Sequence, residues 1–241
     1  GYTIVIGLIE NNDPLSFLTN VVIQAKFFDD FNPNSLEVSE GSTVLKVIPP
    51  NTKSPFIIRS ENPNPNITEV FTTLLKFDTS ESMKNSLIIS NTNIFLDPIS
   101  NLSDSTYTLY FSGTLQNGNA PISETFAYLA FYDVFDRIIQ ISSIEIGDVG
   151  MKEMKSLKLT EEISTSAVGF LLFSESDKFY STILNVKIPP PEIYVKLVSI
   201  SDVTVKDTLG KKLSEVKLGN VVQIESKTSI QFTENNIANE T

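Results

Sequence analysis

The chain has 241 residues, and 41% of them are hydrophobic, so it is long and apolar enough to build packed cores. It contains no cysteine and no histidine, which excludes disulfides, thiolate and imidazole metal sites, and the Ser-His-Asp and Cys-His relays of nucleophilic enzymes. The net charge of −11 makes nucleic acids and anionic membrane surfaces poor partners, because both attract basic proteins.

In chain order, three segments alternate between apolar and polar residues or are rich in β-branched and aromatic ones: 21–27, 71–77 and 222–227. In the first of them, one face is expected to carry Val21, Ile23, Ala25 and Phe27. A period of two is typical of half-buried β-strands. The one stretch compatible with a helical turn is 151–157, so the sequence predicts an all-β fold.

Short motifs recur in the same order along the chain. The paired segments are Gly7–Asn11 with Gly113–Asn117, Phe27–Asp29 with Phe131–Asp133, and Phe71–Leu75 with Tyr180–Leu184. The spacings are 106, 104 and 109 residues, which is the length of an immunoglobulin-like β-sandwich. The sequence therefore predicts tandem immunoglobulin-like β-sandwich domains.

The repeat divides the chain into three parts. Residues 1–84 are expected to form a domain that lacks its first strand, and residues 85–189 a complete domain. Residues 190–241 are either the opening strands of a third domain or a donor-strand tail, with strands at 203–207 and 221–227 around a turn at Leu209-Gly210.

These segments resemble FxLYD-type immunoglobulin-like repeats of prokaryotic surface and secreted proteins. The best match is Leu129–Asp133 and the weaker one is Ala25–Asp29; both depart from the pattern at its first and third positions. The run Asp207–Gly219 resembles domain openings in surface proteins of ammonia-oxidising archaea. The resemblance implies an extracellular adhesive or structural role and supplies no catalytic residues.

One loop has the spacing of calcium ligands. Asp30, Asn32 and Asn34 place side-chain oxygens at alternate positions, as in a calcium-binding loop. However, Ser35 stands where such a loop needs glycine, and Gly41 where it needs glutamate. A hairpin turn stabilised by Asp and Asn side chains explains the same residues.

Three glycosylation sequons, at Asn66, Asn101 and Asn239, favour an exported protein that carries N-glycans. No apolar run approaches the roughly 18 residues of a membrane-spanning helix, so membrane insertion is not expected. The first residues lack the basic start of a signal peptide, which suggests a processed chain or a stretch of a longer one. We therefore expect an extracellular, cell-surface location.

The segment 126–132 leaves one question open. Either Phe126, Tyr128 and Tyr132 face outward as an adhesive patch while Ala127, Leu129 and Phe131 face the core, or the reverse. Aromatic residues at period two are more often core residues and cross-strand neighbours than interface residues.

Two functions fit this organisation, and neither is enzymatic or needs a cofactor. The first is a structural subunit of a cell-surface filament or surface layer, in which a strand at one end of the chain completes the sandwich of a neighbouring copy. The residues expected to take part are Tyr2, Ile4 and Ile6 on the accepting side and Val203 and Val205 on the donating side. The second is an adhesin or accessory binding module, with the chain being a window on a longer multidomain secreted protein. The partners are copies of the chain or other surface proteins.

Overall fold

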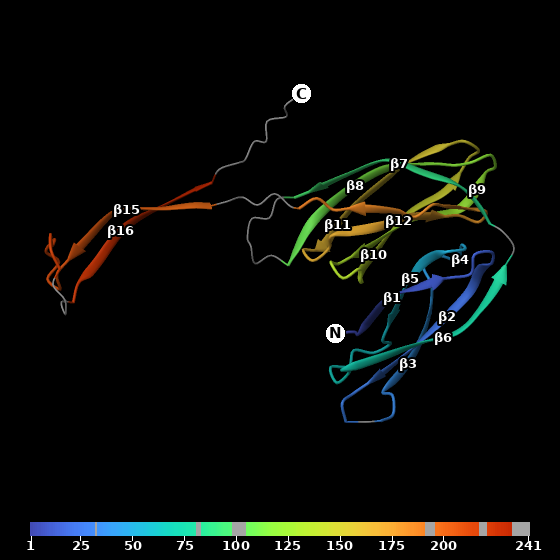
Figure 1. Ribbon diagram of the computed structural model, residues 1–241, viewed down its shortest axis with the longest axis horizontal. Helices are drawn as coiled ribbons and strands as arrows, with labels where there is room; N and C mark the ends of the chain where they lie inside the picture. The colour runs from blue at the N-terminus through green and yellow to red at the C-terminus, as the bar shows by residue number, and fades with distance from the viewer. Residues whose placement is uncertain (32, 81–82, 98–104, 191–195, 217–220, 233–241) are drawn as a thin grey trace. The chain divides into compact units, whose positions relative to one another are not determined.

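The computed structural model describes residues 1–31, 33–80, 83–97, 105–190, 196–216 and 221–232. All regular elements are β-strands, and these residues contain no helix (Figure 1). The prediction of an all-β fold is confirmed. The strands fall into a larger compact unit, Gly1–Asp97 with Ser105–Pro190, and a smaller one that contains β15 (Lys196–Lys206) and β16 (Gln223–Phe232).

Two small sheets make up the first part of the larger unit, which we call the N-terminal module. Its strands are β1 (Ile4–Asn11), β2 (Phe17–Phe28), β3 (Glu37–Ser42), β4 (Val47–Ile48), β5 (Thr52–Arg59) and β6 (Glu69–Ser80). In one sheet β1 pairs with β5, and in the other β2 pairs with β3, β4 and β6, all antiparallel. The predicted inward face of β2 is buried, since Val21, Ile23, Ala25 and Phe27 are at most 2% exposed. They pack against Phe56 and Ile58 of β5.

The second part of the larger unit, the central module, contains eight strands. They are β7 (Lys84–Leu96), β8 (Thr106–Gln116), β9 (Ile122–Tyr132), β10 (Ile138–Val149), β11 (Met154–Ser164), β12 (Gly169–Glu175), β13 (Phe179–Ser181) and β14 (Leu184–Lys187). They join in the order β10-β9-β12-β13-β7-β8-β11, with β14 also on β12, and only β13–β7 is parallel. Because β10 and β11 also lie in contact, this mixed sheet is nearly closed.

The central module contains the two strand groups of an immunoglobulin-like sandwich, β7-β8-β11 and β10-β9-β12-β14. Phe111 of β8 packs edge-on against Phe170 of β12, so the two groups share one core. The parallel β13–β7 link nevertheless merges them into one sheet, so the structure supports tandem immunoglobulin-like sandwiches only loosely. The boundaries expected near residues 84 and 189 stay predictions.

Two buried asparagines show that both modules share one plan. Asn11 ends β1 and Asn117 follows β8, and both are almost completely buried. Each side-chain amide nitrogen donates to three backbone carbonyls at 2.8–3.1 Å: Ser16, Ile48 and Pro49 for Asn11, and Ala120, Val149 and Gly150 for Asn117. The recurring Gly-x-Ile/Leu-x-Asn motif therefore tethers two loops in each module.

The third pair of recurring segments is a misreading of the repeat. Residues 71–75 lie in β6, whose counterpart is β12, because Val70 of β6 faces Phe27 as Phe170 of β12 faces Phe131. Residues 180–184 instead begin in β13. Aromatic, hydroxyl and aliphatic residues are common in strands, so a five-residue likeness of this kind arises without structural equivalence.

Residues 151–157, the one stretch compatible with a helical turn, form a turn followed by the start of a strand. β11 begins at Met154 and pairs with β8 over eleven residues without a register shift. Leu157 and Ile163 are fully buried from this strand, because their even separation places both side chains on its inner face.

Candidate functional site

β6 is exposed along almost its whole length. Every residue of this strand except Val70 is exposed, and Phe71, Leu74, Leu75 and Phe77 leave 43–54% of their surface in solvent. Its counterpart β12 is buried at every position except Leu171. The difference lies at the second edge of each strand: β12 carries β14 and β13 there, whereas within the described residues β6 pairs with β2 alone.

The second edge of β1 is uncovered in the same way. Its counterpart β8 lies between β11 and β7, but the strand partner that the described residues provide for β1 is β5 only. A cavity of about 290 Å³ lies between β1 and β6, and we call it the β1–β6 groove. Its apolar wall consists of Ile9, Leu18, Val21, Leu74 and Phe77. Glu10 and Asp13 line it as well, so two carboxylates border an apolar groove.

The connection from β6 to β7 explains why the β6 edge stays open. β6 ends at Ser80 and β7 begins at Lys84, where the chain already belongs to the sheet of the central module (Figure 1). Three intervening residues cannot form another strand across the N-terminal module. A strand that covers β6 must therefore come from another segment or another molecule.

The two modules meet at a buried carboxylate. Glu175, at the end of β12, is 4% exposed and accepts the backbone N–H groups of Lys46 and Val47, each at 3.0 Å. Burial raises the pKa of Glu175 above its usual 4.5, and the two N–H donors and the Lys46 ammonium offset only part of that effect. Lys46 also bonds Glu124 at 2.7 Å, but both side chains are about two-thirds exposed, so this pair adds little.

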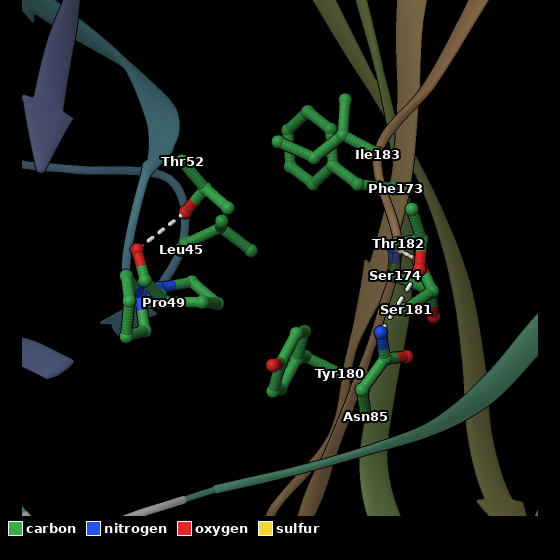
Figure 2. A pocket seen from close by; sticks show the side chains of 11 residues that line it. Leu45, Pro49, Thr52, Asn85, Phe173, Ser174, Tyr180, Ser181, Thr182 and Ile183 are labelled. Carbon is green, nitrogen blue, oxygen red and sulfur yellow. Dashed lines mark hydrogen bonds between the residues drawn. The ribbon is translucent and has the colours of Figure 1, made fainter. Parts of the chain in front are cut away.

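A small pocket lies at the same junction. Figure 2 shows Leu45, Pro49 and Thr52 of the N-terminal module on one side and Phe173, Tyr180 and Ile183 of the central module on the other. Its volume is about 130 Å³. Several of its polar groups already have partners: Asn85 donates to Thr182 at 2.9 Å, Thr52 to the Pro49 carbonyl at 2.7 Å, and the Ser174 N–H to Ser181 at 2.8 Å. We interpret this pocket as packing space between the modules.

The orientation of segment 126–132 is settled by burial. Ala127, Leu129 and Phe131 are fully buried in the core of the central module, whereas Phe126 and Tyr128 lie on the opposite face. That face is not a free adhesive patch. Its Tyr128 and Tyr132 belong to an apolar cluster that includes Ile6, Leu8 and Leu45 of the N-terminal module. Burial, followed by the charge of Glu175, raises the pKa of Tyr128 to about 12.

The residues expected to exchange strands lie in separate compact units. Ile4 and Ile6 are in β1 and Tyr2 precedes it, whereas Val203 and Val205 are in β15. Tyr2, Ile4 and Val203 are about half exposed; Tyr2 lies beneath the guanidinium of Arg59, 3.5 Å from its ring centre. Ile6 is half-buried against the central module. Their role in strand exchange stays a prediction.

The calcium and glycosylation predictions fall partly on described residues. The Asp30 carboxylate accepts the Thr68 hydroxyl at 2.8 Å, Asn34 is exposed, and Asn32 lies outside the described residues. Where the chain is described, no group of three Asp, Glu, His or Cys side chains could hold a metal ion. Asn66 is exposed in the connection between β5 and β6, and Asn101 and Asn239 lie outside the described residues.

Strand-end aspartates stabilise turns. Asp133 accepts the N–H groups of Phe135 and Arg137 and both bonds of the Arg137 guanidinium, at 2.6–3.0 Å. This guanidinium, above all, lowers the pKa of Asp133. Asp207 accepts the N–H groups of Leu209 and Lys211 in the same way. These carboxylates are therefore occupied by the backbone, as expected from their positions next to turns.

The comparisons with known proteins add no family. No protein-family model matches the chain, and the curated proteins contain no match to it. Within the described residues, no helix of membrane-spanning length and hydrophobicity occurs. The geometry described above gives this molecule two candidate functional features, the open β1–β6 groove and the junction at Glu175. Sequence reasoning missed both, although the run of aromatic and aliphatic residues in β6 carried a signal for the first.

Proposed function

We propose that the protein is an extracellular structural protein whose copies join by strand sharing into a cell-surface filament or surface layer. The observation that carries this proposal is the pair of open strand edges on either side of the β1–β6 groove. Natural proteins protect long, flat, apolar strand edges, because such edges pair with other chains. The open edge of β6 runs for twelve residues.

An added strand would satisfy both the backbone and the side chains of this site. Its N–H and C=O groups would bond the free edge of β1 or β6, and its apolar side chains would enter the groove. Leu74 and Phe77 are the half-exposed side chains of β6 that line the groove, and their complete burial would add roughly 1 kcal/mol each, about half the value for a fully exposed residue. Because association itself costs at least roughly 4 kcal/mol, the backbone bonds and the burial of the added strand's own side chains must supply the rest of the stabilisation.

The surroundings of the groove also favour this role. Because the strand donor and the strand acceptor are different segments of the chain, such a contact is heterologous, and it builds a filament wherever its rotation does not close a ring. The sequon at Asn66 lies on the surface between β5 and β6, where an N-glycan is compatible with a cell-surface protein. The resemblance to FxLYD-type repeats supports the same location.

Light scattering and negative-stain electron microscopy of the full chain test the proposal. We expect long polymers that persist in mild denaturant. Leu74→Asp puts a charge in the groove and is expected to raise the concentration needed for assembly at least tenfold, which corresponds to about 1.4 kcal/mol. Val38→Asp, at a similarly exposed position on β3, is the matched control and should assemble normally. A monodisperse monomer at all concentrations would contradict strand sharing.

A further inference from the structure

The two-stranded sheet of the smaller unit has the same geometry as β7 with β8. In the β7–β8 pair the register shifts between Ser90 and Asn93, so two residues oppose the single residue Gly113. In the β15–β16 pair it shifts between Ser201 and Thr204, and again two residues oppose one, Ser226. Both pairs are antiparallel. The β2–β6 and β9–β10 pairs contain bulges with the same count. Among the described strands, however, the bulge follows an Ile-Ser pair and begins with Asn or Asp only in β7 and β15, so we treat β15 as the structural counterpart of β7.

β1 is the counterpart of β8 and has the edge that β8 gives to β7. The buried amides of Asn11 and Asn117 align the two strands, which places Gly7 where β8 has Gly113. A Cβ on Gly113 would meet the Ser90 carbonyl and the Thr92 side chain of the bulge at an ordinary contact distance of 3.6 Å, and its one tight contact, at 3.3 Å, would be with the ring of Phe111. At position 7 the ring of Phe56 requires glycine, since a Cβ there would lie 2.6 Å from the ring atoms.

From this equivalence we propose that β15 of a second copy pairs antiparallel with β1, in the place that β7 holds beside β8. This assignment rests on the proposed strand-sharing function and names its donor and acceptor. The register follows from the bulge. Ile94, the second residue after the bulge in β7, faces Phe111 of β8, so Val205 of β15 faces Val5 of β1. By the same rule Thr204 faces Ile6.

The exchange is favourable because the β15–β16 sheet that it breaks contributes little stability. An isolated two-stranded sheet is marginally stable in water, since it buries no core. Val203 and Ile224 in this sheet are 59% and 66% exposed. Moving β15 from β16 to β1 replaces one antiparallel ladder by another and places Val205 beside Val5, which already packs against the core of the N-terminal module.

Engineered disulfides in the full chain test the register. The protein has no cysteine, so Val5→Cys with Val205→Cys provides the only possible disulfide partners. Residues directly opposite on antiparallel strands have Cα atoms roughly 4.5–5.5 Å apart, within the range of a disulfide. We expect oxidation to give a ladder of covalent multimers on a denaturing gel, and reductant to remove it. Ile4→Cys with Val205→Cys is the matched control, because a one-residue slip puts the side chains on opposite faces.

Each outcome distinguishes this assignment from the proposed function. Polymers seen by light scattering without a covalent ladder would overturn the β15–β1 pairing and leave strand sharing intact, with the groove filled by another segment or another protein. A disulfide within one chain, seen as a fast-migrating monomer, would also overturn it. Monomers without either product would overturn both proposals. If Val5→Cys lowers the melting temperature, the neighbouring pair Ile6→Cys with Thr204→Cys tests the same register.

Discussion

Replacing Asn117 by alanine should destabilise the central module strongly. Its amide nitrogen donates to three carbonyls at 2.8–3.1 Å, and its carbonyl accepts the Gly118 N–H at 2.7 Å. An amide has two hydrogens, so one of the three donations is shared between carbonyls. Asn117→Ala removes all four contacts and leaves buried backbone groups without a partner. At about 0.5–1.5 kcal/mol for each net bond, and with some of the carbonyls reached by water, the expected loss is roughly 2–4 kcal/mol.

Urea unfolding followed by circular dichroism measures this loss. Asn119→Ala lies in the same connection but at an exposed position, and it is the matched control. Asn11→Ala should cost a similar amount in the N-terminal module, since its amide makes the same three donations. If Asn117→Ala unfolds within about 0.5 kcal/mol of the control, the asparagine does not tether the loops and the shared plan of the two modules loses its main support.

Two further predictions concern charged groups. The pKa of Glu175 is raised in the folded protein, so the native state holds this proton more tightly than the unfolded chain, and stability should fall as pH rises from about 4.5 through the raised pKa. Glu175→Gln should flatten the melting temperature over that range; equal slopes in both proteins would refute it. The pKa of Asp133 is lowered below 3.8, so its contribution should be lost as pH falls through the lowered value. Asp133→Asn should melt below the wild type and Asp133→Ala lower still, and a reversed order would refute the turn role.

The sequence predicted which residues form a strand, and which side chains of the strand point to the core, wherever a local pattern determines both. The alternation in residues 21–27 predicted both β2 and its buried face, because one side of the strand meets a core made by the same module. The pattern of β6 predicted a strand but not its exposure. Burial depends on whether another strand covers the second edge, and no local signal in residues 71–77 states that.

The junction between the modules shows the same limit. Glu175 stands in an apolar strand, and its partners are the backbone N–H groups of Lys46 and Val47, which carry no side-chain signature. A contact between residues this far apart in the chain depends on how two modules dock. The alternation in segment 126–132 left two possibilities for which side chains point to the core. Whether the aromatic side chains on the other face are exposed depends on the N-terminal module, which packs against them.

The contrast between β6 and β12 is the reason to regard the groove as a functional surface. Both strands lie beside the same kind of central strand, and both carry large apolar side chains. In the central module, residues that follow β12 in the chain cover its second edge. After β6, by contrast, only three residues precede β7, which already belongs to the central module. An open strand edge of this length invites pairing with other chains, and natural sequences usually block it with charges, proline or a bulge. β6 does carry Lys76, Asp78 and a bulge at Leu75, yet it still presents Phe71, Leu74, Leu75 and Phe77 to solvent, so its edge is suited to receive a strand.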